Sequence, residues 1–137
     1  MLKTELIHPD IMRVLSLCGH GSKVLIADGN YPLAARSGNA EKVFLGLKRG
    51  MPAVTDVLSL VHSVCEIEKA EVMVPEDGST PEIFNEFKKE LNGMELAPLG
   101  RYEFYDACMQ DPNVMLAIST GEQRVYANIL ITIACPE

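Results

Sequence analysis

Residues 24–30 read Val-Leu-Ile-Ala-Asp-Gly-Asn, and this stretch decides which kind of fold the chain can form. Its four apolar residues in a row predict a short strand that lies buried inside a sheet. The Asp-Gly-Asn sequence that follows is a turn signal, so the strand is expected to end at residue 27.

Helices and strands are predicted to alternate around this strand. Apolar residues at helical spacing predict a first helix that Pro9 begins and that Gly19 ends in the left-handed conformation, and Thr80 is expected to cap a later helix. Further helices are expected at residues 53–64, 80–91 and 102–109, and further strands at 43–47, 71–74, 94–99, 114–119 and 128–134. Strands separated by helices indicate an α/β fold with three α/β/α layers around a mostly parallel or mixed central sheet. No repeat or linker interrupts the pattern, so a single domain is expected over residues 1–137.

The balance of charge limits the possible partners. Twelve Lys and Arg against nineteen Asp and Glu in 137 residues give a formal net charge of −7. A field of this sign repels phosphate backbones and anionic lipids, so neither nucleic acid nor a membrane is expected as a partner. A neutral small molecule suits this charge better. Hydrophobic residues make up 47% of a short chain, which predicts that some of them lie in the contacts of a homo-oligomer.

Targeting segments and cofactor motifs are not found in the sequence. The first ten residues have no apolar segment of the secretory kind, and no run approaches the roughly 18 apolar residues of a membrane span, so a cytoplasmic location is expected. The four cysteines are far apart and form no CxxC pair, which argues against a metal site or a disulfide scaffold and predicts reduced, mostly buried thiols. No phosphate-binding or dinucleotide-binding glycine motif is present, so no cofactor is expected.

His20 and Asp28 lie on loops at the two ends of the buried strand. His20 stands between two glycines, and imidazole is well suited to moving protons at cellular pH; the alternative is a histidine placed near the negative end of a helix. Asp28 can hold a ligand or orient an imidazole, or it can bond the backbone of its own turn. A strand of this length spans about 15 Å, so the two residues cannot meet within one subunit unless the loops fold inward.

Two further groups of polar residues could bind a polyol. Tyr126 and Asn128 are two residues apart, so in extended chain their phenol and carboxamide project to the same side; a structural role for the pair is equally compatible. Arg101 has a fork of hydrogen-bond donors and shares a helix face with Tyr105, and a salt bridge to one of the acidic residues is its alternative role. Glu122 follows Gly121 in a turn and could anchor a nearby loop.

Five short segments, taken in order, resemble the fucose mutarotase and ribose pyranase family, known as RbsD/FucU. They are Gly19-His20-Gly21, Ala27-Asp28-Gly29-Asn30-Tyr31-Pro32, Arg101-Tyr102-Glu103-Phe104-Tyr105, Thr120-Gly121-Glu122 and Tyr126-Ala127-Asn128-Ile129-Leu130. The resemblance spans nearly the whole chain. Arg101 followed by aromatic residues looks more like the fucose branch, whereas Ala127 looks more like the ribose branch. Ser22 stands where the family often has an acidic residue, and residues 33–48 match the family poorly.

The resemblance implies an enzyme that interconverts the ring forms of a monosaccharide without cofactor or metal. It implies α/β/α domains assembled into rings, pentamers or decamers, with active sites near subunit contacts. His20 matches the catalytic acid of the family, and Asp28, Arg101, Tyr126, Ala127 and Asn128 match its sugar-binding positions. We therefore expect a carbohydrate isomerase, an L-fucose mutarotase or alternatively a D-ribose pyranase. A non-catalytic sugar-binding accessory protein would use the same contacts without needing His20.

Overall fold

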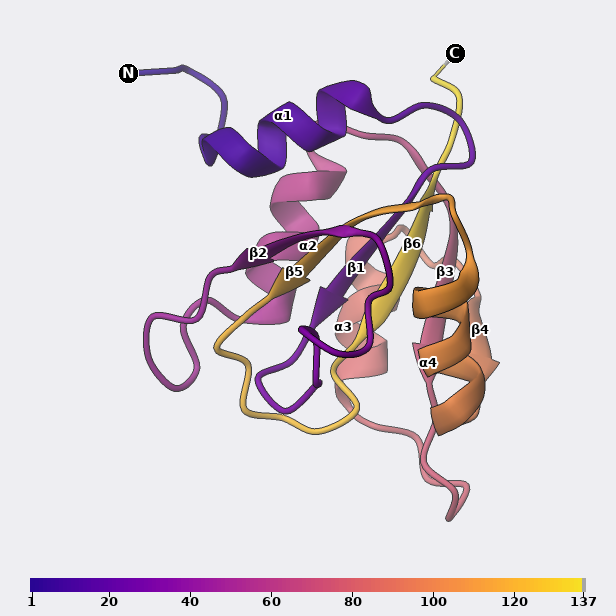
Figure 1. Cartoon of the computed structure of the whole chain (residues 1–137). Coiled ribbons are helices and arrows are strands. Elements are labelled where there is room, and N and C mark those ends of the chain that lie inside the picture. Colours follow the sequence, from indigo (N-terminus) through magenta and orange to yellow (C-terminus); the bar gives the residue numbers. More distant parts are fainter. Residues whose placement is uncertain (137) are drawn as a thin grey trace.

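The computed structural model describes residues 1–136. In this part of the chain six strands form one sheet, and four helices cover its two faces (Figure 1). The helices are α1 (Pro9–Leu17), α2 (Val54–His62), α3 (Ile83–Glu90) and α4 (Arg101–Gln110). The strands are β1 (Lys23–Ala27), β2 (Glu41–Phe44), β3 (Ile67–Met73), β4 (Leu96–Leu99), β5 (Val114–Ser119) and β6 (Ile129–Ile133). The predicted three-layer α/β fold with a mixed central sheet is confirmed.

The directions of the strands bring most of the candidate loops to one edge of the sheet. The strand order is β2-β5-β1-β6-β3-β4. β5 pairs in parallel with β1 and β2, and β3 pairs in parallel with β4, whereas β6 runs antiparallel to β1 and β3. Five strands therefore end at one edge, which we call the carboxyl edge, and the reversed strand β6 begins there. The opposite edge is called the amino edge.

Strand β1 lies in the middle of the sheet and its apolar residues supply both halves of the core. Val24 and Ile26 pack with residues of α1, α2 and α3 on one face, and Leu25 and Ala27 pack with α4 and the segment 31–40 on the other. These four residues of β1 have no exposed surface. Figure 1 shows α2 and α3 behind the sheet and α4 in front of it. The short apolar run thus forms a strand that must be covered on both faces, as the sequence predicted.

Several predicted element ends were wrong. Helix α1 has His8 as its N-cap, but it ends at Cys18 in extended conformation, and Gly21 rather than Gly19 has a positive φ. Strand β2 starts and ends earlier than expected, and β3 starts four residues earlier than expected. Thr80 is not the cap of α3, whose N-cap residue is Glu82 without a side-chain hydrogen bond. The ends of β2 and β3 follow from their pairing with β5 and β6, which local sequence signals do not show.

The structure also tests the expected burial of the cysteines and the expected absence of a membrane span. All four thiols are free, but only Cys108 is buried; Cys18 and Cys65 are half-buried and Cys135 is exposed, so the expectation of mostly buried thiols was wrong. Within residues 1–136, none of the helices has the length and apolar character that crossing a membrane requires.

Gly38 should tolerate alanine less well than Gly78, although both have a positive φ of 55° and 78°. A Cβ at position 38 would overlap the backbone carbonyl of Met109, whereas a Cβ at position 78 meets nothing within 4 Å. The left-handed backbone alone costs an alanine about 1–2 kcal/mol. Gly38→Ala is therefore expected to lower the free energy of urea unfolding by roughly 1–3 kcal/mol more than Gly78→Ala, the range typical of overpacking. Equal losses in the two variants would contradict the close packing of the 31–40 segment on α4.

Candidate active site

A cavity of about 220 Å³ opens at the carboxyl edge and collects most of the predicted binding residues. Its walls come from the ends of β1 and β3, the start of α4 and the loop that enters β6. The lining residues are Asp28, Asn30, Tyr31, Met73, Arg101, Tyr105, Val125, Tyr126 and Asn128. A second hollow of about 500 Å³ shares Arg101, Val125 and Tyr126 with it and extends along the loop between β3 and α3. We call the first of these the sugar-sized cavity.

The carboxylate of Asp28 ties two loops together beneath this cavity. Oδ1 accepts the N–H groups of Asn30 and Tyr31, both at 2.9 Å, and Oδ2 accepts the N–H of Ala127 at 3.1 Å. A carboxylate has about four lone-pair positions, so these three bonds leave one for a ligand. Asp28 is buried, at 2% exposure, and lies on the cavity wall. It therefore bonds the backbone of its own turn, as the structural alternative anticipated, and also faces the cavity.

Burial raises the pKa of Asp28 above its ordinary value of 3.8. The three backbone N–H groups lower it and the charge of Glu122 raises it further, and the net direction is upward. Burial makes the ionised form of a carboxylate costly. A hydrogen-bond donor at its remaining lone pair, such as a ligand hydroxyl, stabilises that ionised form. The electrostatics of this position thus favour a ligand that donates hydrogen bonds.

Tyr126, Ala127 and Asn128 precede β6 rather than form its first residues. Tyr126 has a φ of 56°, so the backbone there is left-handed and the expectation of extended chain was wrong. Tyr126 and Asn128 nevertheless both line the sugar-sized cavity. Asn128 Oδ1 accepts the N–H of Asp28 at 2.8 Å, which leaves its amide NH₂ as the group for a ligand. Ala127 is fully buried and contributes its N–H to Asp28 rather than a side chain to the cavity.

Arg101 begins α4 and is held by tyrosines. Its Nε donates to the hydroxyl of Tyr105 at 3.2 Å, and its guanidinium carbon lies 5.9 Å from the centre of the Tyr102 ring. The predicted shared face with Tyr105 is confirmed, and among residues 1–136 its recorded polar contact is this phenol rather than a carboxylate. The exposed guanidinium therefore keeps most of its N–H donors for a ligand in the cavity.

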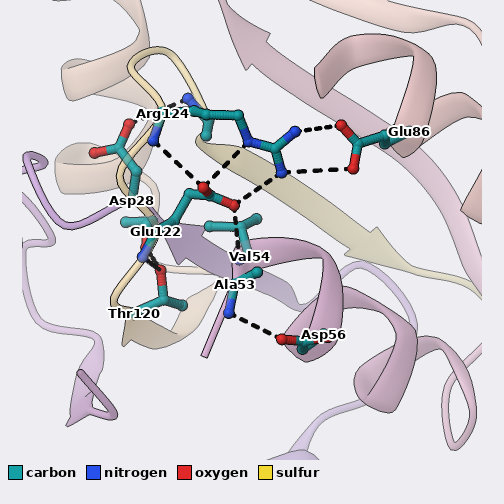
Figure 2. A network of polar contacts seen from close by, with 10 residues as sticks. Asp28, Ala53, Val54, Asp56, Glu86, Thr120, Glu122 and Arg124 are labelled. Carbon is teal, nitrogen blue, oxygen red and sulfur yellow. Dashed lines mark hydrogen bonds and ion pairs between the residues drawn. The ribbon is translucent and has the colours of Figure 1, made fainter. Parts of the chain in front are cut away.

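Glu122 anchors the loop between β5 and β6, and Figure 2 shows its contacts with Val54 and Arg124. This buried carboxylate accepts the Val54 N–H at the start of α2 at 3.3 Å. It also accepts hydrogen bonds from Arg124 Nε at 3.2 Å and from Arg124 Nη2 at 3.1 Å. Arg124 in turn donates to the carboxylate of Glu86 on α3. The loop between β5 and β6 is thereby fastened to two helices, and the predicted anchoring role of Glu122 is confirmed.

The ion pair with Arg124 sets the charge state of Glu122. Burial on its own raises the pKa of this carboxyl, but the hydrogen bonds and charge of Arg124 together with the Val54 N–H outweigh burial, and the pKa lies below its ordinary value of 4.5. Because the pKa is lower in the folded than in the unfolded chain, the ionised carboxylate stabilises the fold above pH 4.5. This stabilisation is lost as the pH falls through the folded-state pKa.

Glu122→Gln should lower the free energy of urea unfolding by about 1.5–3 kcal/mol at neutral pH, the range for hydrogen bonds to charged groups. The difference from the wild type should shrink as the pH falls below 4.5, because the wild-type carboxyl then becomes protonated. Glu86→Gln, which removes the exposed partner of the same arginine, serves as the control and should cost at most about 1 kcal/mol. A loss from Glu122→Gln that stays constant down to the lowest pH would contradict this assignment.

His20 lies at the amino edge, away from the sugar-sized cavity. Its side chain is 60% exposed, and Nε2 lies 3.0 Å from Oε1 of Glu68. It borders a separate hollow of about 390 Å³, to which the end of α2 and the end of β6 also contribute. The prediction that His20 and Asp28 do not meet within one subunit is confirmed, because β1 separates them.

Sequence reasoning missed some residues of both regions. Tyr31 and Met73 line the cavity, and Tyr31 packs edge-on against Tyr105 with ring centres 5.5 Å apart. Tyr31 lies in the segment Ala27–Pro32, so its place beside Asp28 offered a signal, as did the place of Met73 at the end of a strand. Glu68 offered no local signal, because only the pairing of β3 with β6 brings it to His20. Among residues 1–136, no group of three or more His, Cys, Asp or Glu side chains is arranged to hold a metal ion.

Comparison with known proteins places the chain in a family. The fold and the cavity define a small α/β protein with a polar cavity at the carboxyl edge of its sheet. The sequence profile of the RbsD / FucU transport protein family matches residues 1–136, and the chain belongs to that family.

Relatives and solved structures carry both ribose and fucose names. The D-ribose pyranase of Staphylococcus haemolyticus is 29% identical over 131 residues, which cover 96% of this chain and 95% of the relative. Bacillus subtilis RbsD complexed with D-ribose has the same fold, with a TM-score of 0.85, 24% identity and complete coverage of both chains. The fucose mutarotase of Streptococcus pneumoniae in complex with L-fucose gives a TM-score of 0.83 and 23% identity, and the match covers 99% of this chain and 100% of that one. The similarity is thus shared between the two branches, and the expected preference for the fucose branch stays a prediction.

Proposed function

We propose that this chain is a monosaccharide mutarotase that opens and recloses the ring of a free sugar, in a single domain over residues 1–137. The observation that carries the proposal is the convergence of Asp28, Arg101, Tyr126 and Asn128 on one cavity from three distant parts of the chain. An acceptor, a fork of donors, a phenol and an amide together match the alternating hydroxyls of a sugar. The names of the relatives and the sugars bound in the similar structures support a monosaccharide ligand.

The reaction requires two proton movements at the hemiacetal. The bond between the anomeric carbon and the ring oxygen breaks, its electron pair passes to the ring oxygen, and the imidazolium of His20 protonates that oxygen. The anomeric hydroxyl loses its proton to water and becomes a carbonyl. Closure on the other face of the carbonyl reverses these steps and gives the other anomer, and closure through another hydroxyl changes the ring size. A positioned acid–base group contributes roughly 10²–10⁴-fold to such a rate.

A second copy of the chain must supply His20 to the cavity. Within one chain β1 holds the imidazole at the opposite edge of the sheet, and its 60% exposure leaves it accessible to a neighbour. Large apolar side chains are exposed near both edges, among them Leu17 and Val64 near His20 and Tyr102 and Val125 near the cavity. These surfaces fit a homo-oligomer, a pentameric or decameric ring, with its active sites at subunit contacts.

L-Fucose is the proposed substrate, with D-ribose as the runner-up. The aromatic residues after Arg101 support fucose, and the ribose pyranase names of the relatives support ribose. The competing function is a sugar-binding accessory protein without turnover. The separation of His20 from the cavity within one chain is the observation that favours it, because binding alone needs no imidazole.

His20→Ala should abolish catalysed anomer exchange and leave sugar binding within about twofold of the wild type, because the imidazole donates a proton but does not line the cavity of its own chain. Saturation-transfer NMR on L-fucose, D-ribose and D-galactose measures exchange, and calorimetry measures binding. His62→Ala removes a second imidazole that pairs with Glu90 and should leave exchange unchanged. Wild-type exchange in the His20 variant would refute the role of His20, and an inactive wild-type protein that still binds sugar would establish the accessory function.

Two variants that are each inactive should together recover anomer exchange if each active site is formed by two copies of the chain. His20→Ala keeps an intact cavity, and Arg101→Ala keeps an intact imidazole. Co-expression in equal amounts should recover roughly a quarter of the wild-type exchange rate, because about one random subunit pairing in four joins both intact halves. Mixed assemblies are isolated through two different affinity tags and assayed by the same NMR measurement. Complete inactivity of purified mixed assemblies would show that each site is formed within a single chain.

A further inference from the structure

Glu68 lies on an irregularity of β3 that turns its side chain toward His20. In the pairing of β3 with β6, Ile67 is opposite Ile133 and Lys69 is opposite Thr132, so Glu68 is an additional residue without a partner. Such a bulge disturbs the alternation of side chains and redirects one of them. The residues on both sides of the bulge continue to pair, which places the carboxylate at a defined point of the amino edge.

The loop of His20 is fastened to the same strand, β6. The N–H of Gly21 donates to the carbonyl of Ile133 at 2.9 Å, and the N–H of Ile133 donates to the carbonyl of Ser22 at 2.8 Å. The hydroxyl of Ser22 accepts the N–H of Gly19 at 3.0 Å and closes the loop around the histidine. Ile133 therefore holds the histidine loop on one side and the bulged segment of β3 on the other.

The two side chains meet across this shared support. Nε2 of His20 lies 3.0 Å from Oε1 and 3.2 Å from Oε2 of Glu68. A carboxylate only accepts hydrogen bonds, so the contact requires the hydrogen of the imidazole to be on Nε2. In the neutral ring, Nδ1 then carries the lone pair and is the atom that takes up and releases a proton.

We propose that Glu68 is a positioning residue that orients the imidazole of His20 and keeps the hydrogen on Nε2, so that Nδ1 faces the sugar bound by a neighbouring copy. This role rests on the proposed function, since it concerns the same proton transfer. During ring opening Nδ1 of the imidazolium gives its proton to the ring oxygen, and during closure it takes that proton back. The hydrogen between Nε2 and Glu68 stays in place throughout.

The exposure of the pair separates this role from a purely structural one. The side chains are 60% and 44% exposed, and ion pairs at such positions contribute about 0–1 kcal/mol to stability. Removing the carboxylate should therefore leave folding, assembly and the sugar-sized cavity intact. Its effect should be confined to the orientation and tautomer of the imidazole.

Glu68→Ala should lower kcat for anomer exchange about tenfold, a part of the roughly 10²–10⁴-fold that a positioned acid–base group supplies. KM and the calorimetric sugar affinity should stay within about twofold of the wild type, because Glu68 is outside the sugar-sized cavity. Long-range ¹H–¹⁵N spectra of the His20 ring should show the Nε2–H tautomer in the wild type and a mixture of tautomers in the variant. Glu68→Gln should recover part of kcat, because its amide oxygen still accepts from Nε2.

Glu66→Ala is the matched control, because it removes the same kind of exposed carboxylate two residues earlier, whereas the hydrogen bonds of the His20 ring are to Glu68. It should leave kcat and the ring spectra unchanged. A wild-type kcat in Glu68→Ala, an unchanged tautomer, or an equal loss in Glu66→Ala would each overturn the role of Glu68 while leaving the mutarotase function standing. An inactive wild-type protein would instead overturn the proposed function and with it this role.

Discussion

The hydrogen bonds of one buried carboxylate hold the ligand cavity together. Asp28 accepts N–H groups from its own turn and from Ala127, 99 residues further along the chain. In the opposite direction, the carboxamide oxygen of Asn128 accepts the backbone N–H of Asp28. The end of β1 and the start of β6 are therefore joined by contacts in both directions. Without this junction the polar groups of the cavity would sit on two independent loops.

A second junction explains how the loop between β5 and β6 keeps a demanding conformation. Tyr126 has a left-handed backbone, which is costly for a bulky side chain. The loop is fixed near its start by Glu122, which bonds the first turn of α2 and Arg124, and near its end by Asp28. Both fastenings use buried carboxylates, which form stronger hydrogen bonds than neutral groups do. The phenol of Tyr126 thus reaches the cavity wall from a segment without regular secondary structure.

Much of this arrangement could be predicted from the sequence because its signals are local. The apolar run at Val24–Ala27 and the turn after it identified the central strand, and the glycines around His20 identified an exposed loop. The anchoring of the loop by Glu122 was also anticipated. The resemblance of five segments to a known family indicated that these residues belong to one site, because no single segment was specific.

What could not be predicted depends on contacts between distant strands. Three of the four additional residues of β3 pair with β6, and the charged pair Glu68-Lys69 among them gives no strand signal. The left-handed backbone of Tyr126 results from the two fastenings of its loop, which lie four residues before and one residue after it. The contact of Glu68 with His20 requires the register of β3 against β6, which a single sequence does not reveal.

The reversed direction of β6 has a consequence for how such a protein can change. The strand begins beside Asn128 at one edge of the sheet, and it ends at Ile133, which holds the histidine loop at the other edge. Five residues in extended conformation span about 17 Å. Effects of substitutions separated by more than about 7–10 Å usually add without interference. In the proposed mutarotase, substitutions that change the sugar-binding groups at one edge should therefore leave the proton donor at the other edge unaffected.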